Sequence, residues 1–486
     1  MRRANRADVG LLRWPFALLG LQLAGMLAFS TLQYSRYSLS NDFGGYAQAW
    51  YLIGHGDMNP YVSVFRSDFL HNNLDLMMYP LALLGRLIPS PVLLSWAQDC
   101  AIVATEFATL LWVRDYLRLR SDDIGSAAPY LYVGSAALLA VNPWSWETAA
   151  FSLHFGAFAA LFAVLATRDL WRGRYASLAL WVPLGMASEA LGGLYVMAGA
   201  AGALLTREAT PRNRAVAGTV LLTGAAGLVL ATSLHLLGRS GQTLQGTYGY
   251  LIGTHTGTIT PLTLLAGLAR HPGAALRVTE PHLVYVLGYV LAAGLFGIFS
   301  GWGIAALTLI ILPNAMSSQA SFIAFPGAFQ SWPAQPFIIF GTVTALSSLC
   351  ARYRSESGRL TMLRRLSPAF VAVAVLAAME LIALPHKWLL NGLPARELAA
   401  VADRIPHGSA VYADQDFIGR LSERRTAYAY VRPDDILSLT DHTTVLIVTS
   451  STVTASHLRI LGPNSVPLRV TPVFIGSYWR TYLATS

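Results

Sequence analysis

The chain has 486 residues, of which 54% are hydrophobic and only 12% are charged, and its mean hydropathy is +0.48. This composition excludes a soluble protein of several domains and predicts a polytopic membrane protein. The formal net charge is +9, but the basic residues are spread over short segments between apolar runs. That pattern is typical of topology signals and argues against nucleic-acid binding.

The first element expected is a membrane span near 12–33. It follows the basic segment MRRANRADVGLLRW, and no cleavage site of small residues comes after it, so we predict a retained span that runs from the cytoplasm outward. A long apolar block at 176–205 is interrupted by Ser188-Glu189 and predicts a pair of short spans. Other spans are expected near 92–113, 126–142, 147–167, 215–238, 281–300, 302–318, 333–351 and 367–386, about 11 in all.

The stretch 70–90 decides the topology, because it could span the membrane or lie in its surface. Only the second solution puts every dense arginine cluster on the inner side, at 114–120, 168–174, 207–214 and 352–365. We therefore predict a transmembrane domain over 1–388, with a first external loop at 34–91 and another at 239–280. The C-terminal region would then be extracytoplasmic.

The segment SNDFGGYAQAW, directly after the first span, predicts a short helix capped by Ser40 or Asn41. Its Asp42 could accept a proton from a hydroxyl nucleophile, or it could only cap the helix. Tyr46 shares the helical face of Asp42, and we expect Tyr46 and Gln48 to contact a substrate. The neighbouring glycines would leave room for its approach.

The segment SDFLHNNLD places Asp68, His71, Asn72 and Asp75 at helical spacing. Asp68, His71 and Asp75 are candidates for holding a divalent cation, a possible cofactor, and His71 could also act in catalysis. Alternatively, the stripe is the wet face of a helix that lies in the membrane surface.

Several acids and a histidine occur within or beside the later spans. Asp99 and Glu106 lie seven residues apart in one span, and Asp99 could line the same cavity as Asp42. In NPWSWETAAFSLHF, Glu147 and His154 are again seven apart, and we expect them on one helical face near the outer surface. Glu189, at the turn of the short pair, would add another outer acid. A lone acid of this kind is often structural, but their convergence predicts a site.

Arginines in the outer loops could bind an anionic group. Arg66 lies in the first external loop, and Arg270 and Arg277 lie in the loop at 239–280. The arginine fork suits phosphate, so a lipid phosphate is one expected partner, and plain solvated charge is the alternative.

From about 389 to 486 the composition becomes that of a small soluble α/β domain. SAVYAD, TAYAY and TTVLIVTS predict strands, and DQDFIGRLSER predicts a helix between the first two. The strand-helix-strand order predicts a partly parallel sheet. Asp414 and Asp416 follow the first strand, as a helix cap or a functional pair.

The stretches DFGGYAQAW, FLHNNLDLMMYPLALLGRLIPSPVLL, FSLHFGAFAALFAVLATRD, ASEALGGLYV and IPHGSAVYADQDFIGRLSERRTAYAY resemble a bacterial membrane family known as domain of unknown function 2079. That family is similar to the GT-C superfamily of polytopic glycosyltransferases, which use polyprenyl-phosphate sugars. The resemblance implies an essential acid in the first external loop, here Asp42, standing without the usual acidic neighbour.

The resemblance implies a membrane glycosyltransferase that moves a sugar from a polyprenyl phosphate to an envelope acceptor on the outer face, with inversion. Asp42 would be the base, His71, Glu147 and His154 would shape the site, and Arg270 and Arg277 would hold the phosphate. The alternative is a transporter or a non-catalytic partner in envelope assembly, for which Glu106 would be the essential acid.

Overall fold

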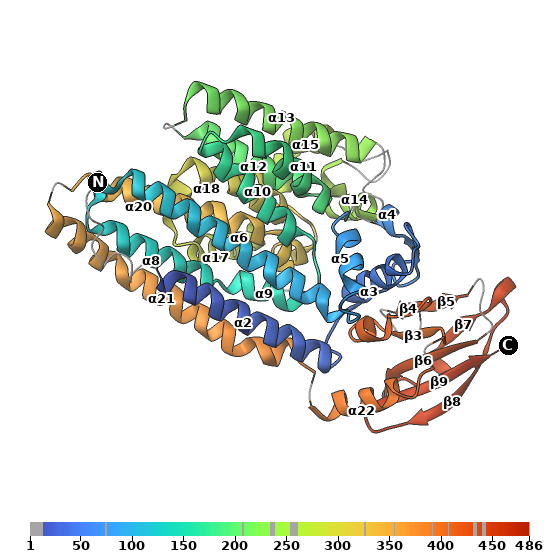
Figure 1. The fold of residues 1–486 in the computed structure, drawn as a ribbon. Coiled ribbons are helices and arrows are strands. Elements are labelled where there is room, and N and C mark those ends of the chain that lie inside the picture. The colour runs from blue at the N-terminus through green and yellow to red at the C-terminus, as the bar shows by residue number, and fades with distance from the viewer. Residues whose placement is uncertain are drawn as a thin grey trace. The chain divides into compact units, whose positions relative to one another are not determined.

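The computed structural model shows a helical molecule with a small sheet-containing part (Figure 1). It describes residues 13–72, 75–206, 209–233, 239–252, 261–324, 327–353, 355–390, 392–406, 408–430, 435–439 and 444–485. These residues form two compact units. The helical unit comprises 1–26, 73–77 and 98–384, and the loop-and-sheet unit comprises 27–72, 78–97 and 385–486. Each unit is described by itself below.

The helical unit is built from most of the apolar segments. Two long helices, α2 (Trp14–Ser35) and α6 (Val92–Leu119), begin or end in the other unit. The others are α8 (Ala127–Ala140), α9 (Pro143–Phe151), α10 (Gly156–Trp171), α11 (Leu178–Ser188), α12 (Gly192–Leu205), α13 (Pro211–Ser233), α14 (Arg239–Ile252), α15 (Pro261–Arg270), α16 (Pro272–Thr279), α17 (Leu283–Ala292), α18 (Gly301–Ala306), α19 (Leu312–Ala315), α20 (Gln335–Ala351) and α21 (Glu356–Trp388).

The structure contains membrane-spanning helices. In the described part of the chain, four helices are long and apolar enough to cross a membrane: Trp14–Ser35, Pro211–Ala231, Trp332–Ala351 and Glu356–Trp388. The expected pair at 176–205 is present as α11 and α12. Two expected spans are interrupted helices: 147–167 is divided between α9 and α10, and a π-helical turn at Leu307–Ile311 separates α18 from α19.

Close packing of the helical unit relies on glycines. A Cβ added to Gly192 at the start of α12 would lie 2.0 Å from the backbone oxygen of Gly185 on α11. A Cβ on Gly199 would likewise overlap the hydroxyl of Thr167 on α10. Small residues let helix backbones approach closely where van der Waals packing holds a membrane bundle together. The short pair α11 and α12 is therefore fixed by backbone contact.

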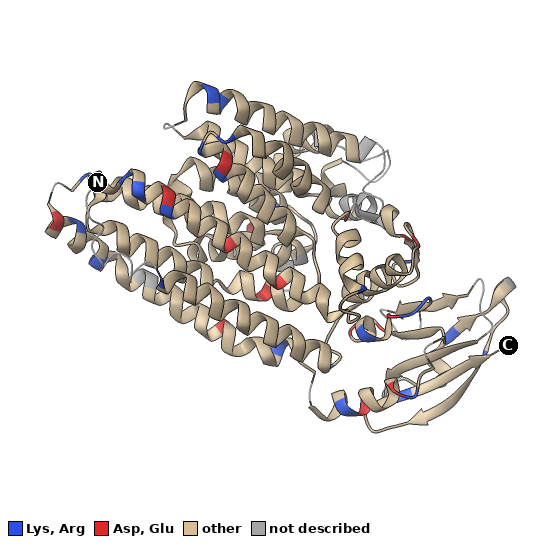
Figure 2. Cartoon of the chain, viewed as in Figure 1, with Lys and Arg blue, Asp and Glu red and all other residues tan. Residues whose placement is uncertain are grey.

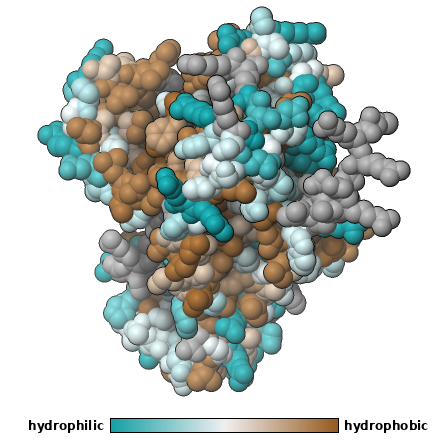
Figure 3. Space-filling view, turned by 90° about the vertical axis from the view of Figure 1, so that its left-hand side faces the viewer, coloured by the Kyte–Doolittle hydropathy of each residue, from teal (hydrophilic) through white to brown (hydrophobic). Residues whose placement is uncertain are grey.

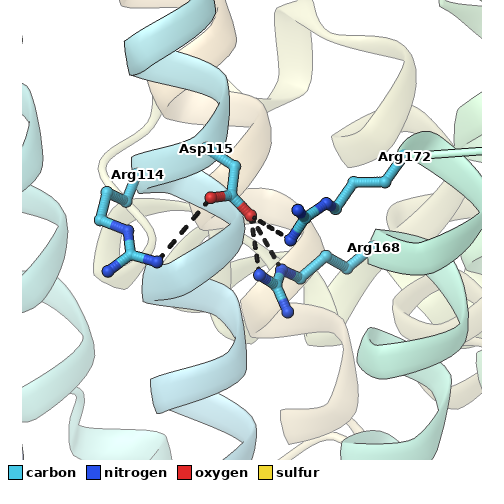
Figure 4. A network of polar contacts seen from close by, with 4 residues as sticks. All are labelled: Arg114, Asp115, Arg168 and Arg172. Atoms are coloured by element: carbon cyan, nitrogen blue, oxygen red, sulfur yellow. Dashed lines mark hydrogen bonds and ion pairs between the residues drawn. The ribbon is translucent and has the colours of Figure 1, made fainter.

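An ion-pair network ties α6 to α10 (Figure 4). Arg168 donates to Oδ2 of Asp115 from Nε at 3.2 Å and from one terminal nitrogen at 2.8 Å, and Arg172 reaches the same oxygen at 3.1 Å. Arg114 lies 3.9 Å from Oδ1. One carboxylate thus gathers three arginines. We call the end of the helical unit around Arg114, Arg168 and Arg172 the arginine end. Figure 2 shows that basic side chains collect there.

The loop-and-sheet unit begins with the residues after α2. It contains α3 (Asn41–Gly54), a two-stranded pair of β1 (Tyr61–Val62) with β2 (Ser67–Asp68), α4 (Phe69–Asn72) and α5 (Met78–Gly85). At 1.5 Å per residue the 8-residue α5 is about 12 Å long, far below the ~30 Å of a bilayer core. It therefore does not span, as the distribution of arginines predicted for 70–90.

A five-stranded sheet forms the rest of this unit, with the helix α22 (Gly392–Ala402) before it. The strand order is β4 (Ala427–Tyr430), β3 (Val411–Asp414), β6 (Thr444–Ser450), β9 (Trp479–Thr485) and β8 (Arg469–Ile475). β3 is parallel to β4 and β6, while β9 is antiparallel to its neighbours, so the sheet is partly parallel as predicted. A short parallel pair, β5 (Ile436–Ser438) with β7 (Arg459–Leu461), lies outside it.

The predicted helix at 414–424 is wrong: only a single 3-10 turn, Ile418–Leu421, forms there. Asp414 accepts the amide hydrogen of Asp416 at 3.0 Å, which caps the turn after β3. Burial raises the pKa of Asp414 above its ordinary value, and the charge of Asp416 adds to the increase. Because the folded carboxyl binds its proton more tightly, the stability it contributes is lost as the pH rises through that raised pKa.

Asp414→Asn should therefore stabilise the protein at neutral pH, since the amide oxygen can still accept from Asp416. It should also flatten the fall in stability above the ordinary pKa of an aspartate. Thermal unfolding of the purified protein at pH values from about 4 to about 8 measures both effects. Asp403→Asn, at an exposed position of the same unit, is the control. Equal curves for the two variants would contradict the prediction.

Candidate functional site

The helix α3 carries the acid singled out in the sequence. Ser40 is its N-cap, and Asp42 lies in its first turn. Asn41 and Asp42 are half-buried, whereas every residue from Phe43 to Trp50 is buried. Asp42 is the single carboxylate of α3, and it is half-buried, as are Tyr51, Leu52 and Gly54 at the other end of the helix. The helix dipole favours a carboxylate at this end of a helix.

The glycines of α3 do not leave an open space. A Cβ on Gly44 would lie 3.2 Å from the side chain of Ile418 and 3.4 Å from the Cα of Gly419, both in the turn after β3. A Cβ on Gly45 would overlap the ring of Phe65, which also meets Tyr46 edge to face at 5.6 Å between ring centroids. The space expected for a substrate is thus filled by protein on this side of the helix.

Gln48 is completely buried, and its amide joins three segments of this unit. Nε2 donates to Oγ of Ser63 at 2.8 Å and to the carbonyl of Arg425 at 3.0 Å, while Oε1 accepts from the amide of Val64 at 3.1 Å. Ser63 in turn exchanges hydrogen bonds with the backbone of Ala427 at 2.6 and 2.9 Å. This arrangement, here called the Gln48 clamp, holds α3 against the start of β4. The clamp uses both amide hydrogens, and we assign Gln48 to it in place of the predicted substrate contact.

Gln48→Leu should lower the free energy of unfolding by about 3 kcal/mol, because it leaves the buried amide of Val64 and the carbonyl of Arg425 without a partner. Limited proteolysis should then cut the C-terminal sheet faster than in the wild type. Thermal unfolding in detergent gives the stability. Gln415→Leu is the matched control in the same unit, and a clamp variant as stable as this control would refute the assignment.

The predicted polar stripe of residues 68 to 75 is not helical throughout. Asp68 belongs to β2, where it pairs with Tyr61, and α4 covers only Phe69–Asn72. His71 and Asp68 remain close, with 4.0 Å between Nδ1 and Oδ2, but their side chains are 75% and 47% exposed. The alternative of a wet surface fits these two residues better than a catalytic or metal site.

No metal site forms from the predicted residues. Asp75 is buried, in contrast to the exposed pair Asp68 and His71. Throughout the described ranges, no three histidine, cysteine, aspartate or glutamate side chains gather closely enough to hold a metal ion. Arg66 is exposed in the turn between β1 and β2. Burial raises the pKa of Tyr412 in the sheet, and the positive charge of Arg66 opposes that increase.

In the helical unit, His154 lies in the break between α9 and α10 and not on a helix. The amide of Gln98 on α6 occupies this break: it donates to the carbonyls of Thr148 at 3.0 Å and Ser152 at 2.7 Å, and it accepts from the amide of His154. The predicted single helix through Glu147 and His154 is therefore wrong, because Gln98 satisfies the backbone groups that the break exposes. Glu147 itself is fully buried in α9.

The His154 ring packs against two aromatic rings that are also nearly parallel to each other. Phe329 lies at 3.5 Å and Phe151 at 5.3 Å between centroids, both nearly parallel to the imidazole. Among the described residues, Nε2 of His154 has no hydrogen-bond partner although it is buried. Phe329 and Gln98 were not singled out from the sequence, since nothing in their local pattern links them to position 154.

Glu189 directly follows α11, and its side chain contacts the start of helix α10. A Cβ placed on Gly156 would be 2.8 Å from Oε2 of Glu189, so the carboxylate rests on the first turn of α10. The unsatisfied amides and dipole of a helix N-terminus favour a carboxylate there. Within the described part of the unit, Oε2 accepts no hydrogen bond. Glu189 thus contacts the first turn of α10, whose first residue, Gly156, follows His154 by two positions in the chain.

The two acids of α6 are both buried, at 0% exposure for Asp99 and 1% for Glu106. Ser145 donates to Oε1 of Glu106 at 2.6 Å, and the indole of Trp332 donates to Ser145 at 2.8 Å. This chain of contacts links α6, α9 and the start of α20. Arg270 and Arg277, predicted to hold a phosphate, are exposed on α15 and α16.

These elements together define a multi-pass membrane protein with a GT-C-like fold. The apo crystal structure of ArnT from Cupriavidus metallidurans shares this fold, with a TM-score of 0.51 and 12% identity over 96% of this chain and 98% of that chain. The structure of the same protein bound to undecaprenyl phosphate gives a TM-score of 0.48 and 12% identity, over 96% and 97% of the two chains. No model of a known protein family and no curated protein matches the sequence.

Proposed function

We propose that the protein is a membrane glycosyltransferase that moves a sugar from a polyprenyl phosphate to a hydroxyl group of an envelope acceptor, on the outer face of the membrane. Asp42 takes the proton of the acceptor hydroxyl. The hydroxyl oxygen then forms a bond to the anomeric carbon while the bond to phosphate oxygen breaks, and the polyprenyl phosphate leaves with the electron pair. A single displacement of this kind inverts the anomeric centre.

The observation that carries the proposal is the position of Asp42. It is the one carboxylate of α3, it is half-buried in the first turn of the helix, and the Gln48 clamp fixes the helix that bears it. A base must be held in place and remain accessible, and both conditions are met here. The fold shared with ArnT, a GT-C glycosyltransferase, supports the reaction class.

We also propose roles for polar residues outside α3. In the helical unit, Glu189 and His154 offer a carboxylate oxygen and a ring nitrogen without partners among the described residues, which suits recognition of sugar hydroxyls. Arg270 and Arg277 are accessible for a lipid phosphate. Each of these proposed roles can be tested by substituting that residue alone.

The function is tested by supplying the purified protein in nanodiscs with radiolabelled polyprenyl-phosphate sugars and a cell-envelope extract as acceptor. We expect transfer of label from the lipid fraction to the envelope fraction, together with release of polyprenyl phosphate. Lipid-linked sugars that stay intact with every donor, while the protein is folded, would exclude the enzyme. Uptake of sugar or lipid without bond cleavage would instead identify the transporter alternative.

A further inference from the structure

A cavity of about 780 Å³ opens in the helical unit, separate from the residues considered so far. Its walls come from α6, α10, α12, α18, α20 and the turn Phe296–Phe299 before α18. Six aromatic side chains line it: Tyr116, Trp171, Phe296, Phe299, Trp302 and Phe340. The volume is in the range of small-molecule sites, and the aromatic walls suit an apolar body.

The cavity belongs to the arginine end of the bundle. Two of its lining residues, Tyr116 and Trp171, are sequence neighbours of Asp115 and Arg172 in the ion-pair network between α6 and α10. Figure 3 looks onto this end, where hydrophilic side chains stand between hydrophobic ones. A ligand here would meet a membrane surface on one side and the apolar bundle on the other.

One face of α20 leads from the apolar interior to a charge. Phe340, Thr344, Ser348 and Arg352 follow one another at intervals of four residues, so they form one stripe along the helix, and all four line the cavity. Phe340 is completely buried, whereas Ser348 and Arg352 are exposed. The stripe therefore grades from apolar to cationic, as an amphipathic ligand would require.

Three of the hydroxyl groups that line the cavity have already used their hydrogens. Thr344 donates to the carbonyl of Gly341 at 2.9 Å, Ser348 to that of Thr344 at 2.9 Å, and Ser300 to that of Gly297 at 2.8 Å. Each oxygen keeps lone pairs, so these groups accept but do not donate. Among the described lining residues, Arg352 is the only charged group and the main donor for an anion.

Arg352 differs from the other arginines at this end. Arg114, Arg168 and Arg172 all face Asp115, whereas the guanidinium of Arg352 forms no ion pair with any described residue. Because Arg352 directly follows α20, a favourable interaction with the helix dipole would explain a cation here without any ligand. That account does not explain a cavity with aromatic walls directly beside the charge.

We propose that this cavity binds a phosphate-bearing membrane lipid, with the phosphate on Arg352 and the upper part of an acyl chain along Phe299, Trp302 and Phe340. The guanidinium fork pairs with phosphate oxygens, and the hydroxyl oxygens of Thr344 and Ser348 accept from hydroxyls of the headgroup or its water. The lipid would be a resident component of the bundle and not the substrate. Inorganic phosphate can form the same pair with the guanidinium as the lipid headgroup, but it has no acyl chain to contact the aromatic walls.

Native mass spectrometry of the full chain in detergent tests this, with phosphatidylglycerol, dioleoylglycerol and inorganic phosphate as three separate probes. Arg352→Gln should weaken the tightest phosphatidylglycerol adduct about tenfold, which is the loss expected for one charge-assisted pair. Binding of dioleoylglycerol, which has no phosphate, should not change. Ser348→Phe, which fills the mouth of the cavity, should reduce the binding of both lipids.

The matched control is Arg365→Gln, an exposed arginine of α21 that does not line the cavity. Equal phosphatidylglycerol binding by the Arg352 and Arg365 variants would overturn the proposal and leave the helix-dipole account. Inorganic phosphate that binds as tightly as the lipid would overturn the lipid as occupant. Unchanged adducts in Ser348→Phe would place the bound lipid elsewhere.

Discussion

Asp42→Asn is expected to lower the rate of sugar transfer by about 10²- to 10⁴-fold, which is the contribution of a positioned general base. Asparagine has nearly the same shape but cannot accept the proton of the acceptor hydroxyl. Because the amide also keeps a hydrogen-bond acceptor at the start of α3, the melting temperature should change little. Single-turnover transfer from a labelled polyprenyl-phosphate sugar, measured at saturating donor, isolates the chemical step.

Glu106→Gln is the matched control for this experiment. Glutamine can still accept from Ser145, so the buried contact chain with Trp332 is kept while the titratable carboxyl group is lost. A glycosyltransferase should retain most of its activity in this variant. The opposite pattern, in which the Glu106 variant loses function and Asp42→Asn is tolerated, would favour proton-coupled transport. Tolerance of both substitutions would favour a scaffold.

Gly192→Ala is expected to destabilise the helical unit by about 3 kcal/mol, at the upper end of the cost of overpacking a core. The new Cβ would lie 2.0 Å from the backbone oxygen of Gly185, and a backbone oxygen cannot rotate away as a side chain can. α11 and α12 would have to separate. The temperature at which half the protein aggregates in detergent should fall by several degrees, as followed by size exclusion after heating.

Gly218→Ala provides the comparison, because Gly218 lies within α13 and nothing is within 4 Å of its added Cβ. Alanine has the higher helix propensity, so this variant should be as stable as the wild type or more stable by up to about 1 kcal/mol. If both variants melted at the same temperature, backbone contact would not determine the packing of α11 on α12.

The fold was predictable where one local pattern determines the element. Apolar runs of the length of a span became helices, and the alternation in TTVLIVTS became β6. Helical spacing gave a wrong prediction where another residue forms hydrogen bonds with the backbone in place of the helix. Asp68 has the spacing of a helix but pairs with Tyr61 in a β-ladder, and the helix through Glu147 ends because Gln98 takes up the free carbonyls.

The residues of interest at the candidate site could be singled out from the sequence, but the contacts that each of them makes could not. Asp42 and Glu189 were singled out as acids at helix boundaries, and both are found there. Gln48 was expected to bind substrate because it lies on the same helix as Asp42. Its partner Arg425 is 377 positions away in the chain, and no local spacing can reveal a contact of that kind.

The loop-and-sheet unit also constrains the topology. Residues 34–72 and the C-terminal sheet belong to one compact unit, so they lie on the same side of the membrane. The chain between 92 and 388 must then cross an even number of times. The prediction of about eleven spans, less the first, leaves ten, which satisfies this condition. The side itself stays a prediction from the arginine distribution.

The Gln48 clamp has a consequence for the order in which the protein is made. Its donor on α3 is synthesised early, shortly after the first span, but the carbonyl of Arg425 and the backbone of Ala427 appear only when all the spans are complete. The helix that bears Asp42 is therefore secured late, after the start of the C-terminal sheet has been made. A chain that ends after α21 but before Arg425 would contain every long apolar helix and lack the partners of the Gln48 clamp. Quality control of this chain thus coincides with the end of translation.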